Sequence, residues 1–298
     1  MNKLTKLLPD KIFLKLVFYK NTGYSLSFKN PKTFNAKLQW LKVYNRDPIL
    51  TMLVDKYEVK EYIKEKIGEE YIIPTVGIWD NADEIDFDRL PEQFVLKCTH
   101  DSGSAVFCKN RKEFNIEDAK YRLGQALSNN YFYAGREWPY KNVKPRIMAE
   151  PYMTDKNSEY LIDYKLMCFN GKVKCSFVVT DRYSEDGLKV TFFDRNWKKM
   201  PFERHYPSDK KEIPCPAKYE QMIELAEKLS RNIIFVRVDF YEIEGKIYFG
   251  ELTFSPGGGF EEFRPLEWDK KLGEWITLPV ETKKKKRKKD KHNSSQCW

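Results

Sequence analysis

The chain has 298 residues, of which 41% are hydrophobic and 15% aromatic, enough apolar material for one large or two closely packed domains. Its formal net charge of +9 is concentrated in residues 283–291, KKKKRKKDK, which hold eight basic residues and one acidic residue and leave +2 for the rest. No nucleic-acid partner is expected, because such charge runs are usually solvated, and residues 279–298 are predicted to be a disordered basic tail. Six cysteines without a CxxC pair and three histidines exclude a zinc site of ordinary spacing and favour a reduced, cytoplasmic protein.

Residues 1–70 are predicted to form a helical N-terminal region. Thr33 is a candidate cap for a helix with one apolar face, and a second amphipathic helix ends before Gly68. Lysines and Pro9 interrupt the first twenty residues, so this segment lacks the continuous apolar stretch of a signal peptide or a membrane span. A helix that lies along a membrane surface is the alternative there.

The rest of the chain is predicted to be richer in strands. From Tyr71 onward, short apolar runs alternate with polar and proline-containing turns, and single helices are expected at 117–128 and 217–231. Further strands are expected at 146–153, 163–169, 172–180 and 189–194 and on both sides of the Glu244-Gly245 turn. The Asn170-Gly171 dipeptide is a strong hairpin signal. The fold class is therefore α+β with antiparallel sheets, not a doubly wound parallel sheet.

A first candidate site follows the apolar run FVLKC, which ends one residue after Lys97. The small polar loop after it contains His100, Ser102, Gly103 and Ser104, and backbone N–H groups and an ammonium can converge there on phosphate oxygens. The alternative is an ordinary hairpin turn with a chance lysine. For His100, phosphate contact and an inert turn residue both remain open. The absence of a GxxxxGK[ST] sequence argues against a Walker-type NTPase.

A second candidate site lies in residues 236–259, VRVDFYEIEGKIYFGELTFSPGGG. Arg237 and Asp239 share one face of a strand, and Glu251 and Thr253 share one face of the returning strand. A carboxylate inside an apolar sheet is costly unless it is paired or binds a metal, and Mg²⁺ commonly takes one or two protein carboxylates together with phosphates. The alternative pairs Asp239 with Arg237 and leaves Glu251 at a sheet edge.

The Ser255-Pro256-Gly257 sequence that follows allows a ligand to approach the backbone closely. Taken in order, these motifs resemble the ATP-grasp superfamily, which includes D-alanine–D-alanine ligase, and more closely its TupA-like branch of bacterial surface-polysaccharide and teichuronopeptide type. The resemblance covers roughly residues 30–278. It implies an ATP-grasp fold whose two subdomains, 71–145 and 146–278, each contain an antiparallel sheet and clasp ATP between them.

The resemblance also implies which residues bind the nucleotide. Lys97 matches the phosphate-binding lysine, and the loop after it matches the mobile glycine-rich loop that covers the phosphates. Glu150, Tyr152 and Met153 lie in RIMAEPYM, which resembles the hinge strand beside adenine, and Lys165 lies in the motif that follows. ATP is therefore an expected cofactor.

Catalytic and metal-binding roles are implied for the second candidate site. Arg237 is expected to stabilise the reaction centre, Asp239 and Glu251 to bind Mg²⁺, and Gly257 to help form the oxyanion hole. The superfamily usually has E-x-N in its metal motif, whereas this chain has Thr253 in place of the Asn. A hydroxyl is a weaker ligand than an amide carbonyl, so two-metal occupancy is in doubt.

The function implied by the resemblance is ATP- and Mg²⁺-dependent ligation of a carboxylate to an amine through an acylphosphate. The TupA-like branch suggests a uronic acid of a surface or capsular polysaccharide as donor and an amino acid as acceptor. One alternative is a glycosyltransferase, although the nearest D-x-D sequence, Asp86-Phe87-Asp88, lies in a polar loop. Another is a non-enzymatic module that docks on a membrane or on nucleic acid through its tail. The expected location is the cytoplasm, with tail contact at the inner face of the membrane.

Overall fold

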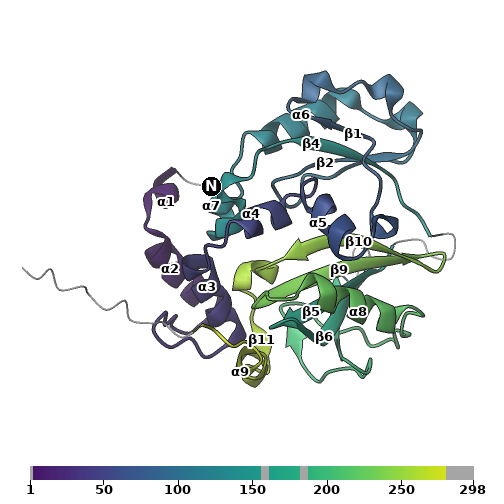
Figure 1. The fold of residues 1–298 in the computed structure, drawn as a ribbon. Helices are drawn as coiled ribbons and strands as arrows, with labels where there is room; N and C mark the ends of the chain where they lie inside the picture. Colours follow the sequence, from purple (N-terminus) through teal and green to yellow (C-terminus); the bar gives the residue numbers. More distant parts are fainter. Residues whose placement is uncertain (1–2, 156–160, 182–186, 280–298) are drawn as a thin grey trace, which may run out of the picture.

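The computed structural model describes residues 3–155, 161–181 and 187–279 and is built on two antiparallel sheets (Figure 1). The four-stranded sheet has the strand order β1-β4-β2-β3, and the five-stranded sheet has the order β10-β9-β5-β6-β7. The expected α+β class with antiparallel sheets is confirmed. The predicted basic tail lies outside the described residues from residue 280 onward.

The strands are β1 (Gly77–Trp79), β2 (Phe94–Cys98), β3 (Val106–Cys108), β4 (Ile147–Pro151), β5 (Asp163–Phe169), β6 (Lys172–Thr180), β7 (Lys189–Asp194), β8 (Glu203–Arg204), β9 (Phe235–Ile243), β10 (Lys246–Thr253) and β11 (Phe263–Arg264). The α-helices are α1 (Lys3–Leu7), α2 (Asp10–Thr22), α3 (Phe34–Tyr44), α4 (Ile49–Val54), α5 (Val59–Lys66), α6 (Ile116–Leu127), α7 (Phe132–Gly135), α8 (Tyr219–Leu229) and α9 (Glu267–Glu274). The short 3₁₀ helices that bear on the site are η3 (Phe87–Arg89), η5 (Trp138–Asn142) and η6 (Pro256–Gly259).

The N-terminal region is helical, as its sequence pattern predicts. Thr33 caps α3 because its side-chain oxygen accepts a hydrogen bond from the backbone N–H of Ala36 at 3.1 Å. The buried side chains of Phe13, Leu14 and Phe18 on α2 pack in one cluster with Ala36 of α3. No helix in the described part of the chain is long and apolar enough to cross a membrane.

The four-stranded sheet divides its side chains between an apolar and a charged face. Leu96 and Ala149 lie opposite each other and belong to a buried cluster that includes α6. Lys97 and Glu150 occupy the alternate positions of β2 and β4 and therefore point to the other face. The charged face is the one that meets α5, whose Lys60 contacts Glu150.

Strand β4 joins this first sheet rather than the second. It pairs with β2 from Phe94–Pro151 to Cys98–Ile147 and with β1 on its other side. The predicted boundary between residues 145 and 146 had placed this strand with residues 146–278, whereas the chain leaves the first sheet only after Pro151. Strand β4 pairs with β2 because the side chains of both strands alternate between the same apolar face and the same charged face.

The five-stranded sheet buries one whole face and half of the other. One face forms a hydrophobic cluster with α8, α4 and α5. On the opposite face, Phe169 and Phe235 belong to a cluster with residues of α3 and α9. Further along this face, Lys165 lies directly opposite Asp239 on the neighbouring strand. The covering helices therefore leave a polar region at one end of the sheet.

Candidate active site

Five charged side chains form a connected network on the polar end of the five-stranded sheet. Arg237 donates from Nε to Asp239 Oδ1 at 2.6 Å and from Nη2 to Asp239 Oδ2 at 2.7 Å. The same Nη2 lies 2.5 Å from Glu251 Oε1. Lys165 Nζ lies 2.5 Å from Asp239 Oδ2 and 3.3 Å from Asp163 Oδ2. Bidentate, charge-assisted bonds of this kind fix side-chain geometry strongly, so the network is well organised.

A β-bulge brings the two predicted metal ligands together. The register of β9 and β10 shifts between Phe249 and Leu252, so that Gly250 and Glu251 together oppose Asp239. A side chain at position 250 would meet the Asp239 backbone at 3.2 Å, which explains the glycine. The bulge turns Glu251 toward Arg237.

The two carboxylates differ in electrostatic environment. Asp239 is buried, and this burial raises the pKa of Asp239 against the opposing influence of Arg237 and Lys165. The Glu251 side chain is 41% exposed. Against the cost of desolvation, the positive charges of Arg237, Lys165 and Lys56 lower the pKa of Glu251 to about 2. One carboxylate is therefore enclosed and the other is ionised and accessible.

The donor set fits a magnesium–nucleotide complex better than an isolated metal ion. Within residues 3–155, 161–181 and 187–279, no three His, Cys, Asp or Glu side chains gather into a complete metal cage. Mg²⁺ normally completes its shell with phosphates and water, for which Asp239 and Glu251 suffice. Thr253 donates its hydroxyl to Glu251 Oε1 at 3.1 Å and so lies beside them. The structure also contains both features of the alternative interpretation: Asp239 is paired with Arg237, and Glu251 lies on the edge strand β10. The assignment of Asp239 and Glu251 as metal ligands therefore stays a prediction.

The charged face of the four-stranded sheet carries more positive than negative charge. Glu150 is buried, and its two oxygens lie 2.5 Å from Lys97 Nζ and 2.6 Å from Lys60 Nζ. Burial would raise the pKa of Glu150, but Lys97 and Lys60 outweigh it and lower the pKa below its ordinary value. Two lysines share one carboxylate, so this face keeps an excess positive charge.

The predicted phosphate loop is anchored at its base. His100 is buried, and its Nε2 lies 3.0 Å from the carbonyl oxygen of Asn129, so the ring contacts backbone just beyond α6. Ser104 donates its hydroxyl to Asp101 Oδ1 at 2.6 Å and accepts from the N–H of Cys98 at 2.9 Å. Both residues therefore hold the loop, and in this structure neither side chain projects from its tip.

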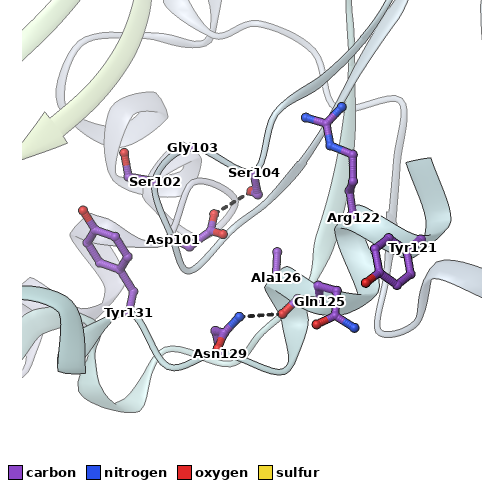
Figure 2. A pocket seen from close by; sticks show the side chains of 10 residues that line it. All are labelled: Asp101, Ser102, Gly103, Ser104, Tyr121, Arg122, Gln125, Ala126, Asn129 and Tyr131. Atoms are coloured by element: carbon purple, nitrogen blue, oxygen red, sulfur yellow. Dashed lines mark hydrogen bonds between the residues drawn. The ribbon is translucent and has the colours of Figure 1, made fainter. Parts of the chain in front are cut away.

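The tip of the loop is open. Ser102 and Gly103 are exposed, and Gly103 has φ +95°, with no atom within 4 Å of where a Cβ would lie. Figure 2 shows the Tyr131 side chain pointing toward Ser102. A cavity of about 430 Å³ separates the loop from α6. Its lining residues are Asp101, Ser102, Gly103, Ser104, Tyr121, Arg122, Gln125, Ala126, Asn129 and Tyr131. None of them belongs to the five-stranded sheet, so this cavity is distinct from the carboxylate pair.

Lys56 joins the site although it is not among the predicted site residues. Its backbone N–H donates to Thr99 O at 3.0 Å, and its ammonium group donates to the carbonyl of Asp101 in the loop. Burial lowers the pKa of Lys56, and the negative charge of Glu251 is the largest opposing influence. Lys56 thus lies between the loop and the carboxylates. In the sequence, the Asp55-Lys56 pair just before the second amphipathic helix is the signal that could have marked it.

The predicted adenine-contacting residues Tyr152 and Met153 follow the end of β4. The Tyr152 N–H donates to Gln93 O at 3.2 Å, and its ring lies 6.2 Å from that of Phe107. Both residues begin the segment that leads from the first sheet to the second, which is the place expected of a hinge. Their contact with a base remains a prediction.

The glycine-rich turn after β10 is held from three directions. Gly257, Gly258 and Gly259 have φ of +56°, +61° and +65°, a left-handed backbone that favours glycine. Lys42 donates from Nζ to Gly258 O at 2.5 Å, and Gln39 donates to Gly259 O at 2.7 Å. Arg204 donates to Pro256 O at 2.6 Å. The carbonyl groups of the turn are therefore bound from outside the turn.

A buried acid and two tyrosines lie near this turn and were not predicted. Glu137 is 7% exposed and, among the described residues, its carboxylate accepts no hydrogen bond and forms no direct ion pair. Burial raises the pKa of Glu137, and Lys42 is the nearest opposing charge. The rings of Tyr131 and Tyr140 stand 4.8 Å apart, and Glu137 is the largest charge influence on both. Glu137 and the turn lie far apart in the sequence, so no local pattern links them.

The sequence matches the TupA-like ATP-grasp family over residues 36–277. Among solved structures, D-alanine–D-alanine ligase from Helicobacter pylori shares 17% identity at a TM-score of 0.42, over 84% of this chain and 70% of that one. The Bacillus anthracis D-alanine–D-alanine ligase complexed with ATP shares 14% at 0.39, over 69% of this chain and 57% of that one. D-cycloserine synthetase DcsG shares 14% at 0.39, over 77% and 72%. No curated protein sequence matches the chain.

The family match runs from within α3 to just beyond α9 and includes both candidate sites. It therefore covers the loop after Lys97, the carboxylates Asp239 and Glu251 and the glycine-rich turn. The predictions of an ATP-grasp fold and of an ATP-grasp enzyme are confirmed by this match. The chain belongs to the TupA-like ATP-grasp family.

Proposed function

We propose that the protein is an ATP- and Mg²⁺-dependent ligase that joins a carboxylate to an amine through an acylphosphate. The observation that carries this proposal is the meeting of two oppositely biased surfaces. Lys97 immediately precedes the open loop and Lys56 binds it, while Asp239 and Glu251 lie on the polar end of the other sheet. Lys56 is within electrostatic range of Glu251 and so links the two regions. Such a site suits a polyphosphate whose charge is shared between lysines and a metal ion.

In this proposal the first sheet binds the nucleotide. Lys97 and Lys56 offset phosphate charge, while the exposed tip at Ser102 and Gly103 supplies backbone N–H groups. Glu150 acts on Lys97 by holding its ammonium group in place. Tyr152 and Met153 border the base, and His100 and Ser104 fix the base of the loop.

The second sheet supports the reacting groups. Asp239 and Glu251 would hold Mg²⁺, with Thr253 as a weaker neighbour, and the ion supplies charge neutralisation at the transferred phosphoryl group. Lys165 keeps Asp239 oriented through its 2.5 Å contact. Arg237, which already bonds to both carboxylates, and the Gly257 N–H would stabilise the oxyanion, at about 3–4 kcal/mol per donor.

The proposed reaction has two steps. A carboxylate oxygen of the donor attacks the γ-phosphorus of ATP, and ADP leaves. The amine nitrogen then attacks the acyl carbon, inorganic phosphate leaves, and the amine loses a proton.

The finer substrate assignment rests on the family resemblance. We propose a uronic acid of a surface or capsular polysaccharide as the carboxylate donor and an amino acid as the acceptor, in a cytoplasmic protein whose tail at 283–291 contacts the inner face of the membrane. The glycosyltransferase alternative gains no support from its D-x-D sequence. Asp86 accepts a hydrogen bond from the N–H of Asp88 at 3.2 Å and caps the short helix η3.

The nucleotide site is tested by thermal unfolding of the purified protein. Mg-ATP at a hundred times its dissociation constant is expected to add about 2.7 kcal/mol of stability, and the Lys97→Ala variant is expected to lose this gain. Lys144→Ala is a matched control, because the Lys144 ammonium group forms an exposed ion pair with Asp80. Stabilisation by a UDP-sugar but not by ATP would reject the proposal in favour of a glycosyltransferase. ADP release from pairs of uronic acids and amino acids, with mass spectrometry of the amide, tests the substrates.

A further inference from the structure

The outward side of α2 carries a stripe of exposed apolar side chains between lysines. Ile12, Leu16 and Tyr19 are 50%, 59% and 61% exposed. At about 100° per residue they share a sector of roughly 60°. Lysines border this sector on both sides. We refer to Lys11, Ile12, Lys15, Leu16, Tyr19 and Lys20 as the α2 face.

The stripe is not needed for the core. The inner side of α2 already buries Phe13, Leu14 and Phe18 in the cluster with α3, so the helix is apolar on two opposite sides. Single exposed apolar residues are normal on protein surfaces, but several in a contiguous patch with a charged border indicate an interaction site.

A buried arginine fixes the orientation of the α2 face. The Arg136 side chain donates to the carbonyl groups of Thr5, Lys6 and Leu8 at 2.7, 3.3 and 3.3 Å, and its Nε lies 3.3 Å from Asp10 Oδ1. These contacts join α1 and α2 to the segment that carries the site's Tyr131 and Glu137. These contacts attach the α2 face to the body of the molecule. Helix α3 contacts both α2 (Figure 1) and the glycine-rich turn.

The charge of this region identifies the partner. Residues 3–22 contain five lysines and one acidic residue, Asp10, which is engaged by Arg136. A second copy of the same face would oppose lysine to lysine, which disfavours self-association. An anionic lipid surface instead accepts the lysines at its headgroups and the apolar stripe at the acyl boundary, and Tyr19 suits the interface between them.

We propose that the α2 face docks the protein on an anionic phospholipid membrane, with α2 lying in the plane of the surface. The fixed attachment through Arg136 then holds the candidate active site at a set distance from the lipid headgroups, where membrane-borne substrates are accessible. This inference stands apart from the ligase reaction, because it depends only on the surface of α1 and α2.

Vesicle sedimentation tests the docking surface in a chain that ends at Pro279, which removes the basic tail. Vesicles of phosphatidylcholine alone are compared with vesicles that contain phosphatidylglycerol. We expect binding only to the anionic vesicles. The I12S/L16S variant should lower the partition coefficient at least tenfold, and K15E/K20E about 25-fold or more, since each lysine near an anionic surface contributes about fivefold. The controls I116S/L266S and K210E/K211E change exposed residues elsewhere and should stay within twofold of the parent.

Three results would overturn the proposal. The chain ending at Pro279 could fail to bind anionic vesicles while the full chain binds, which would assign binding to the tail alone. The α2 variants could bind as tightly as their controls. Light scattering could reveal a dimer that I12S/L16S dissociates and that does not sediment with vesicles, which would make the face a contact between subunits. Near-ultraviolet circular dichroism of each variant verifies that the fold is kept.

Discussion

The charged faces of the two sheets carry opposite charge balances. On the four-stranded sheet and its flanking helix, Lys97 and Lys60 share the single carboxylate of Glu150. On the five-stranded sheet, three carboxylates, of Asp163, Asp239 and Glu251, share Lys165 and Arg237. The first surface therefore retains positive charge and the second retains negative charge.

This difference explains how one fold can hold a nucleotide that is itself strongly charged. A polyphosphate needs cations on one side, and its metal ion needs carboxylates on the other. Neither surface is simply a patch of like charge, because Glu150 restrains the lysines and Arg237 restrains the acids. Each sheet thus keeps its functional groups oriented before any ligand binds, which favours catalysis by positioning.

The strongest test of the second surface is Asp239→Asn, which keeps the shape of the side chain and removes its charge. Loss of a metal ligand should lower ADP production about 10³-fold, equivalent to about 4 kcal/mol in the activation barrier. ATP binding without Mg²⁺, measured by thermal shift, should change little because the proposed phosphate contacts lie on the first sheet and its loop.

Asp163→Asn is the matched control for this prediction. Asp163 shares Lys165 with Asp239 but does not bond to Arg237, so its loss should cost less than tenfold in turnover. Full activity of Asp239→Asn, or equal losses in the two variants, would remove the metal assignment from Asp239.

A second test, Glu150→Gln, removes the negative charge that binds Lys97 and Lys60 on the four-stranded sheet. Two lysines would then lie beside a neutral group in a buried setting, and we expect a loss of about 3 kcal/mol in the free energy of unfolding, measured by urea denaturation at pH 7. Glu65→Gln is the control, because the Glu65–Lys66 pair is exposed and should contribute less than about 1 kcal/mol. A loss of under 1 kcal/mol in Glu150→Gln would mean that Glu150 does not hold the two lysines.

Much of the charge difference between the two sheets could be predicted from the sequence, because strand alternation decides which side chains share a face. The Asn170-Gly171 turn formed as predicted, with φ of +50° and +78° and Phe169 paired to Lys172. Alternation does not state which strands become neighbours, and β4 was therefore assigned to the other subdomain.

Contacts between segments that are far apart in the sequence could not be predicted either. Lys56 lies on the short connection between α4 and α5, and Glu137 on the one between α7 and η5. Only tertiary packing places them near Glu251, and the apolar periodicity of their own segments carries no information about that distance. The sequence motifs therefore singled out candidate residues on the strands and in the two glycine-containing loops, but not those on the short connections between helices.

The smallest expected effect is a change in the free energy of unfolding at acid pH that depends on Glu251. The folded-state pKa of Glu251, about 2, lies below its ordinary value of 4.5, so its interactions stabilise the fold above pH 4.5 and are lost as the pH falls toward 2. Burial raises the pKa of Asp239, which acts in the opposite sense, so the informative quantity is the difference between wild type and Glu251→Gln. Because the side chain is 41% exposed, we expect this difference to change by about 1 kcal/mol or less between pH 5 and 2, measured by urea unfolding. The change should shrink in 1 M salt. Parallel profiles in low salt would show that Arg237 and Lys165 do not hold Glu251 in its ionised form, and the negative bias of the second sheet would then rest on Asp239 and Asp163 alone.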